Sequence, residues 1–468
     1  MAVGTHGDVL PFIALGHELL KRGHGVSLAA PAPFEAMARR AGLAFQPLGT
    51  VADYEAVIRQ PDLWHPQQGF RPMFDYALQV AEPACLWLGA TRARGVDLRV
   101  IASPLGWGAR LAQDLYDLPT ATLHVMPFLI ESRYDPPRLP GLPLPRFLPA
   151  SLRAYVNLGV DKVAVGPFAL PPLNALRARL GLDPVYRLRH WWNSPTGMLL
   201  MFPDWYAEPQ ADWPGQAVQL GFPLVDRFGD VAAMPPELEA FLDAGDPPIV
   251  FTYGSAMRQG AGFFDTAVRL CRRMGRRGVL LAPQGGQVPK PLPAGIIHLP
   301  YAPLSALLPR SAALVHHGGV GTVAQALAAG VPQLVVPVAF DHFDEGRRLK
   351  DRDLGATLSR RAFRPARAAR VLGRLRADPA VVPVAFDHFG EGRRLKDRDL
   401  GATLSRRAFR PARAARVLGR LLADPAVARA CTAARARMAG GPDAILDACD
   451  YVERLTTAEA GSGPSAAS

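Results

Sequence analysis

Two glycine-rich turns carry the side chains of this 468-residue chain that are best placed for chemistry. The first reads GTHGDV over 4–9, and the second reads HHGGVGT over 316–322. The second turn follows an apolar run and precedes a helical pattern, so it places unpaired backbone N–H groups at a helix N-terminus, where a phosphate is favoured. Ligands of parallel sheets bind outside the carboxyl ends of the strands, so the two turns would face each other across a cleft between two halves.

The first turn offers two candidate bases. The carboxylate of Asp8 lies at the mouth of the turn and could accept a proton from a hydroxyl group. It could equally cap a helix that begins near Pro11, since Asp is a preferred cap. His6 is a rival base because the ordinary pKa of histidine is nearer neutrality.

The second turn predicts an anion site. Its glycines permit close approach of the backbone, a threonine hydroxyl stands at the helix start, and either histidine could donate to a phosphate oxygen. The residues assigned to this site are His316, with His317 as the other candidate, Gly318, Gly319, Gly321 and Thr322. Neighbouring histidines point apart and neither Cys nor carboxylate joins them, so no metal is expected.

A third turn follows the apolar run PIVFTY. Gly254 and Ser255 come directly after this expected strand and could touch the same phosphate group. The alternative is an ordinary turn between a strand and a helix.

The net charge of +12 raises nucleic acid or an anionic membrane as a partner. Most of it lies in two blocks, 336–381 with 11 basic and 6 acidic residues, and 382–427 with 10 and 5. Their basic residues recur on helical periods, which is typical of solvated helix faces. We therefore expect no nucleic-acid partner, and attraction to an anionic membrane surface stays open.

These two blocks are the same sequence written twice. They match at 44 of 46 positions and differ at Asp344 against Gly390 and Arg376 against Leu422. Each copy encodes roughly a strand, a helix, a short strand and a helix, and one such unit suffices there. We expect the chain to leave the native path within the first copy and to rejoin it 46 residues later.

The remaining sequence indicates an α/β protein. Expected strands include Val26 to Ala30, Leu98 to Ala102 and Thr120 to Val125, with a second alternating series after position 247. Only Met1 to Val3 remain for a strand before the first turn, so that strand looks clipped. Four scattered cysteines predict reduced structural thiols, and the apolar runs are too short for a membrane span or signal peptide, so a cytoplasmic location is expected.

Several stretches together resemble the family 1 glycosyltransferases, especially bacterial rhamnosyltransferases, sterol glucosyltransferases and antibiotic glycosyltransferases. They are the opening GTHGDVLPFIALGHELLKRGH, the linker DWP…GFPLVD, PIVFTYGSA, YAP and HHGGVGTVAQALAAGVPQLVVPVAFDH. The resemblance implies a GT-B fold of two facing Rossmann-like doubly wound domains. The expected divisions are an acceptor domain 1–205, a linker 206–246, a nucleotide-sugar domain 247–440 that contains the duplication, and a C-terminal helix and tail 441–468.

The resemblance also implies roles for individual residues. Asp8 falls where the family has its base, and the second turn matches the diphosphate-binding turn. Tyr301 matches the aromatic residue that stacks on the nucleotide base, and Asp341 with His342 matches the Asp-Gln pair that holds the sugar. His342 and Glu345 depart from the family's Gln and Asn, and Asp387 with His388 repeats the pair in the second copy.

The expected activity is an inverting, metal-independent transfer of a hexose from a UDP- or dTDP-sugar, without a cofactor, to a hydroxyl of a hydrophobic acceptor such as a lipid, sterol or natural product. Apolar sequence around Trp107, Met126 to Ile130 and Leu139 to Leu148 suits such an acceptor, but it equally suits core. Two alternatives are a nucleotide-sugar epimerase of the same fold and an inactive nucleotide-sugar-binding protein.

Overall fold

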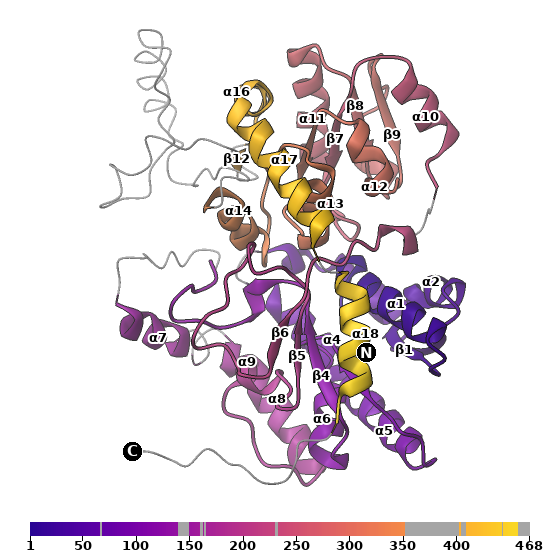
Figure 1. Ribbon diagram of the computed structural model, residues 1–468, viewed down its shortest axis with the longest axis vertical. Helices are drawn as coiled ribbons and strands as arrows, with labels where there is room; N and C mark the ends of the chain where they lie inside the picture. Colours follow the sequence, from indigo (N-terminus) through magenta and orange to yellow (C-terminus); the bar gives the residue numbers. More distant parts are fainter. Residues whose placement is uncertain are drawn as a thin grey trace.

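The computed structural model places two α/β bodies one above the other (Figure 1). It describes residues 1–65, 68–138, 149–159, 162, 165–229, 233–351, 402–403, 409–441 and 443–456. Within these residues, no helix is long and apolar enough to cross a bilayer. The four cysteines are all buried and unbonded to one another.

The strand pairs in the described residues of the N-terminal half are all parallel. One pair joins β1 and β2, and a four-stranded sheet has the order β3-β4-β5-β6. The strands are β1 (Ser27–Pro31), β2 (Ala44–Leu48), β3 (Val100–Ala102), β4 (Thr120–His124), β5 (Met198–Leu200) and β6 (Ala217–Gln219). The three strands expected from the sequence are therefore confirmed, and β6 extends this sheet into the segment that was expected to be linker.

Residues 1–3 bridge the strand pair and the four-stranded sheet. Ala2 N donates to Ala29 O of β1 (2.9 Å), while Met1 O accepts from Ser103 N just after β3 (3.0 Å). Val3 N donates to the Ser103 hydroxyl (3.1 Å). These three residues thus occupy the place between β1 and β3 where the sequence predicts a short first strand.

The helices of this half surround these strands. They are α1 (His6–Lys21), α2 (Glu35–Arg40), α3 (Val51–Arg59), α4 (Phe70–Gln79), α5 (Ala81–Arg92), α6 (Trp107–Tyr116), α7 (Ala150–Gly159), α8 (Gly166–Arg179) and α9 (Leu188–Trp191). Helix α1 begins at His6, earlier than expected, because Thr5 and Asp8 form a capping box there, so Pro11 lies inside the helix. Trp107 and Phe128 are buried in the core of this half.

The C-terminal half has one parallel six-stranded sheet in the order β12-β11-β10-β7-β8-β9. The strands are β7 (Ile249–Thr252), β8 (Gly278–Leu281), β9 (Ile296–Leu299), β10 (Ala313–His316), β11 (Gln333–Val335) and β12 (Ala402–Thr403). Strands β7 to β11 are mainly apolar, as expected for a parallel sheet that is covered on both faces. The strand order reverses between β7 and β10, which is where ligands bind in doubly wound sheets.

The helices of the C-terminal half are α10 (Pro236–Asp243), α11 (Ala261–Met274), α12 (Leu304–Leu307), α13 (Val320–Ala329), α14 (His342–Asp351), α16 (Pro411–Ala423) and α17 (Pro425–Gly440). Helix α14 comes from the first copy of the duplicated segment, whereas β12 and α16 come from the second. Each of these three elements thus comes from a single copy. This arrangement is expected if the chain leaves the native path in the first copy and rejoins it 46 residues later in the second.

The last helix, α18 (Ala444–Arg454), returns to the N-terminal half and packs against α1 (Figure 1). Arg22 at the end of α1 donates to Asp450 (2.6 Å) and Glu453 (3.0 Å) of α18. Helix α17, just before it, packs against α13 in the other half. Helix α17 thus contacts the helix that follows the second glycine-rich turn, and α18 contacts the helix that follows the first.

Candidate active site

The first turn holds Asp8 by its own backbone. Gly4 has a φ of 145°, and a Cβ there would lie 2.2 Å from Asp8 Oδ2, so only glycine fits beside the carboxylate. Thr5 N (2.8 Å) and the Thr5 hydroxyl (3.3 Å) both donate to Oδ2. Oδ1 therefore remains the carboxylate oxygen that can accept from a substrate hydroxyl.

Asp8 is thus a helix cap, and this does not remove it as a base. Burial raises the pKa of Asp8, and the two hydrogen bonds from Thr5 oppose that rise by stabilising the ionised form. A raised carboxylate pKa makes the group a stronger base once it is ionised. The sequence interpretations of Asp8 as cap and as base are therefore compatible.

An aromatic cluster borders the first turn. The ring of His6, the rival base, meets the edge of Phe34 with centroids 5.0 Å apart, and Phe34 meets Tyr54 at 5.9 Å. Burial, followed by the negative charge of Asp8, raises the pKa of the Tyr54 hydroxyl above its ordinary value. Tyr54 therefore lies near the Asp8 carboxylate and remains protonated at neutral pH.

The second turn leaves a helix N-terminus open. Helix α13 has Gly319 as its N-cap, with no side-chain cap and no acidic residue in the first turn. Gly321 is exposed, and a Cβ on it would meet nothing within 4 Å. The first N–H groups of α13 are therefore available to an anion, as the sequence predicts.

The two histidines of this turn have different surroundings. His316 is buried, its Nε2 pairs with Gln333 Oε1 (3.0 Å), and its Nδ1 accepts from Gly318 N (3.3 Å). Both ring nitrogens are thus used inside the fold, and burial lowers the pKa of His316 to about 3. The assignment of His316 as a phosphate donor is therefore at odds with this geometry.

His317 is better placed for that role. Cβ atoms built on Gly254 and Gly319 would lie 3.2 and 2.6 Å from His317 Nε2, so its ring fits between the turns after β7 and β10. Burial lowers its pKa to about 4, which leaves the neutral ring with one N–H to donate. The predicted Gly254 turn and the second turn therefore meet at His317.

Asp341 and His342, the pair that is predicted to hold the sugar, lie beside the second turn. A Cβ on Gly318 would lie 3.1 Å from His342 O, and the rings of His317 and His342 meet edge to face at 4.7 Å. Asp341 O accepts from Asp344 N (2.8 Å) and Glu345 N (2.9 Å) at the start of α14. The structure thus brings Asp341 and His342 of the first copy to the second turn, while Asp387 and His388 lie outside the described residues.

Asp341 also connects the two halves electrostatically. Burial, followed by the charges of Glu345 and Asp8, raises the pKa of Asp341 well above its ordinary value. The contribution of Asp8 shows that carboxylates from the first turn and from the start of α14 lie within interaction range. Acidic groups of the two halves, one in the first turn and one beside the second turn, therefore lie near each other.

Two contributors to this site were not found from the sequence. Thr5 donates to Asp8, and the Trp64 ring stacks on His342 with centroids 6.3 Å apart. His317, the alternative that the sequence offered to His316, takes the position between the turns. A Thr-x-x-Asp spacing is a capping-box signal and could have identified Thr5. Trp64 is 278 positions before His342 in the sequence, so no local pattern marks their contact.

Tyr301 lies against the connection between the halves. Its hydroxyl donates to Asp226 O (3.3 Å), and a Cβ on Gly229 would meet that hydroxyl at 2.5 Å. The ring is half-buried. Base stacking by Tyr301 stays a prediction, as do contacts of Ser255 and Thr322 with a diphosphate.

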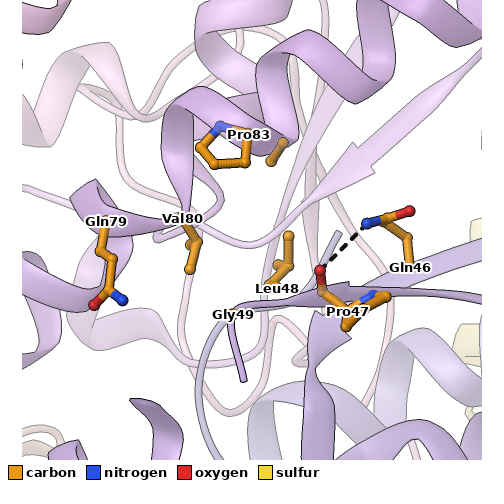
Figure 2. A pocket seen from close by; sticks show the side chains of 8 residues that line it. Gln46, Pro47, Leu48, Gly49, Gln79, Val80 and Pro83 are labelled. Carbon is orange, nitrogen blue, oxygen red and sulfur yellow. Dashed lines mark hydrogen bonds between the residues drawn. The ribbon is translucent and has the colours of Figure 1, made fainter. Parts of the chain in front are cut away.

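The described residues line two cavities, one away from the predicted site residues and one that reaches the residue before Gly254. One of about 180 Å³ lies at the end of β2 and includes none of the predicted site residues (Figure 2). It is lined by Gln46, Pro47, Leu48, Gly49, Gln79, Val80, Pro83 and Ala84. The other, of about 280 Å³, lies between α11 and α16 and reaches Tyr253, directly before Gly254.

Solved structures with this architecture define the class. The chain aligns over 97% of its length with 97% of the glycosyltransferase of kitacinnamycin, with a TM-score of 0.67 and 19% identity. It aligns equally far with the glycosyltransferase VinC in complex with dTDP, with a TM-score of 0.60 and 19% identity. The fold is therefore the two-domain GT-B fold of glycosyltransferases.

Sequence relatives define the family. The glycosyltransferase family 28 N-terminal domain matches residues 1–93, and the erythromycin biosynthesis protein CIII-like C-terminal domain matches 279–385. O-mycaminosyltylonolide 6-deoxyallosyltransferase of Streptomyces fradiae is 32% identical over 73% of this chain and 80% of its own length. A sterol 3-beta-glucosyltransferase of Arabidopsis thaliana is 28% identical over 76% of this chain and 56% of its own length. The chain belongs to the family 1 glycosyltransferases.

Proposed function

We propose that this glycosyltransferase moves a hexose, with inversion, from a UDP- or dTDP-linked sugar to a hydroxyl of a hydrophobic acceptor, without a metal ion or cofactor. The observation that carries the proposal is the uncapped N-terminus of α13, next to Asp341, which lies within interaction range of the Asp8 carboxylate. One feature accepts the leaving diphosphate, and the other activates the acceptor.

The proposed reaction needs three parts of the site. Asp8 Oδ1 removes the proton of the acceptor hydroxyl as the oxygen attacks the anomeric carbon. The bond from that carbon to the diphosphate oxygen breaks, and its electron pair leaves with the nucleoside diphosphate. The N–H groups of α13 and the ring of His317 stabilise the charge that develops on this leaving group.

The donor and acceptor classes rest on the relatives together with the site. The VinC structure contains dTDP, and the relatives named above act on a macrolide-type lactone and on sterols according to their names. Such acceptors are apolar around one reacting hydroxyl. Cytoplasmic location and attraction to an anionic membrane surface remain predictions from composition.

One incubation tests the proposal. The protein is mixed with UDP-glucose or dTDP-rhamnose and a panel of sterols, macrolide aglycones and long-chain alcohols, and the products are separated and weighed by mass spectrometry. Glycosylated acceptor supports the proposal. An isomerised donor sugar indicates the epimerase, and donor binding without product indicates the inactive binding protein.

A further inference from the structure

The duplicated segment fills two places in the fold from two different copies. Helix α14 belongs to the first copy, whereas β12 and α16 belong to the second. The copies are identical at 44 of 46 positions, so most contacts would be the same whichever copy filled either place. Beside the direct connection of the first copy to β11, the difference between the copies lies at the two positions where their residues differ.

The first of these positions is 344, where the first copy has Asp and the second has Gly390. The Asp344 side chain is fully buried. Its Oδ1 accepts from Arg347 Nε (2.9 Å) and from Arg138 N (2.9 Å), and its Oδ2 accepts from Arg348 Nε (2.8 Å). The arginine charges hold the pKa of Asp344 below its usual range although burial acts to raise it.

This network ties α14 to the N-terminal half. Arg347 Nη1 donates to Asp135 Oδ1 (2.9 Å), and Arg348 Nη1 lies 3.2 Å from Asp135 Oδ2. The carboxylates of Asp344 and Asp135 therefore both contact the guanidinium groups of Arg347 and Arg348. Glycine at position 344 would remove the buried carboxylate that accepts from both arginines, and removal of one member of a buried ionic network is strongly destabilising.

The second position is 422, where the second copy has Leu and the first has Arg376. Leu422 is half-buried near the end of α16 and packs against the core cluster of the C-terminal half. That cluster includes Leu418 and Leu421 of the same helix. An arginine there would lose apolar burial, although its long side chain could still reach water, so the penalty is smaller.

The places of α14, β12 and α16 could be filled in three ways: by the first copy alone, by the second copy alone, or by the first copy at α14 and the second at β12 and α16. If the second copy supplied everything, Gly390 would replace Asp344. If the first copy supplied everything, Arg376 would replace Leu422. The observed route alone has both Asp344 and Leu422 in place.

We infer that Asp344 and Leu422 select this route, and that Asp344 is thereby the positioning residue that holds Asp341 and His342 of the first copy at the cleft. Asp341 stands at the N-terminus of α14, and its carbonyl accepts from Asp344 N and Glu345 N. Asp344 joins this helix to Arg138 N of the N-terminal half and holds the two arginines that reach Asp135, so it fixes the place of Asp341. The inference concerns the path of the chain and holds whatever group the enzyme transfers.

Three deletions test it, because each removes 46 residues and leaves a single copy. Deletion of 352–397 keeps Asp344 and Leu422, deletion of 382–427 keeps Asp344 with Arg376, and deletion of 336–381 keeps Gly390 with Leu422. The three proteins are otherwise identical, so each controls the others. We expect deletion of 336–381 to melt about 10 °C below deletion of 352–397, and deletion of 382–427 to melt a few degrees below it, on the order of the network and burial losses.

Circular dichroism gives the melting temperatures and shows whether each protein folds. A folded product from deletion of 352–397 beside a less stable or unfolded product from deletion of 336–381 supports the inference. Equal melting of these two proteins overturns it. The measurement requires no turnover, so failure of the proposed transfer activity would leave its result unchanged.

A swap in the full-length chain tests the same choice directly. Asp344→Gly combined with Gly390→Asp moves the acid to the second copy, and the parent protein is the control. Amide hydrogen exchange followed by mass spectrometry distinguishes 342–351 from 388–397 because they differ by Asp against Gly. We expect the first peptide to exchange more slowly in the parent and the second to do so in the swap; an unchanged order overturns the inference.

Discussion

The two glycine-rich turns match position by position, yet their helices begin differently. Gly4 and Gly318 both have positive φ, of 145° and 109°, and each precedes a helix N-cap. Two residues after the N-cap, both turns again have glycine with open space around it. The third position after the N-cap is Asp8 in α1 and Thr322 in α13.

This difference assigns the turns opposite electrostatic roles. Helix α1 begins with a threonine cap and supplies its own anion at the N-terminus, so its N–H groups stabilise Asp8. Helix α13 begins with a glycine cap and supplies no anion, so its N–H groups remain for a ligand. One backbone design thus serves a resident carboxylate in one half and an incoming diphosphate in the other.

Replacing the resident anion should give the largest effect. Asp8→Asn keeps the size of the side chain but removes the proton acceptor, so kcat/KM for transfer should fall by about 10²- to 10⁴-fold. Binding of dTDP or UDP, measured by calorimetry, should stay within about threefold. His6→Gln is the matched variant for the rival base, and a greater loss from His6→Gln would move the assignment to histidine.

Giving the second turn its own anion should make it resemble the first. Thr322→Asp places a carboxylate at the same helix position as Asp8, where it would compete with the diphosphate for the N–H groups of α13. We expect the Kd for dTDP or UDP to rise by about 100-fold, since both charge repulsion and donor loss act on one ligand. Thr322→Asn is the neutral control of equal size, and equal Kd values for the two variants would contradict the anion site.

The pH dependence of transfer should report the surroundings of Asp8. Because burial raises its pKa, kcat/KM should begin to fall at a pH above that of an ordinary carboxyl group, by about tenfold per pH unit. The Thr5 hydroxyl bond lowers that pKa, so Thr5→Val should move this acid limb to higher pH. Thr5→Ser keeps the hydroxyl and should leave the limb in place; coincident profiles for Val and Ser would exclude this role of Thr5.

The smallest effects are expected from alanine substitutions at Gly4 and Gly7, the two glycines of the first turn. Gly4→Ala meets both a positive φ and the Asp8 carboxylate, so it should lower the free energy of unfolding by about 1–3 kcal/mol. Gly7→Ala, inside the first turn of α1 with nothing within 4 Å, should be neutral or raise it by up to about 1 kcal/mol. Urea unfolding of both variants measures the contrast, which vanishes if the turn tolerates a Cβ at Gly4.

Local sequence patterns predicted the strands and the two turns, because these features depend on residues that are close together in the sequence. Continuous apolar runs marked the strands of the six-stranded sheet, and the glycine spacing marked both turns, as the structure confirms for the elements around them. The direction of each histidine ring was not predictable, because it depends on Gln333 and Gly254 from other elements. Trp64 was missed for the same reason, since its contact with His342 joins the two halves.

The duplication shows another limit of local patterns. Two nearly identical copies have the same propensities, so the sequence could predict that one copy is surplus. The short connection to the second turn favoured the first copy at 341–342, but no local pattern showed which copy supplies β12 and α16. That choice depends on partners far along the chain, such as Asp135 for α14 and the core around α11 for α16.

The two C-terminal helices α17 and α18 contact the helices that follow both glycine-rich turns. Helix α17 packs on α13, the helix of the diphosphate turn, and α18 packs on α1, the helix of Asp8. Three positions of the sequence separate these two helices. A change in this part of the C-terminus would therefore act on both turns while every residue of the turns stayed the same.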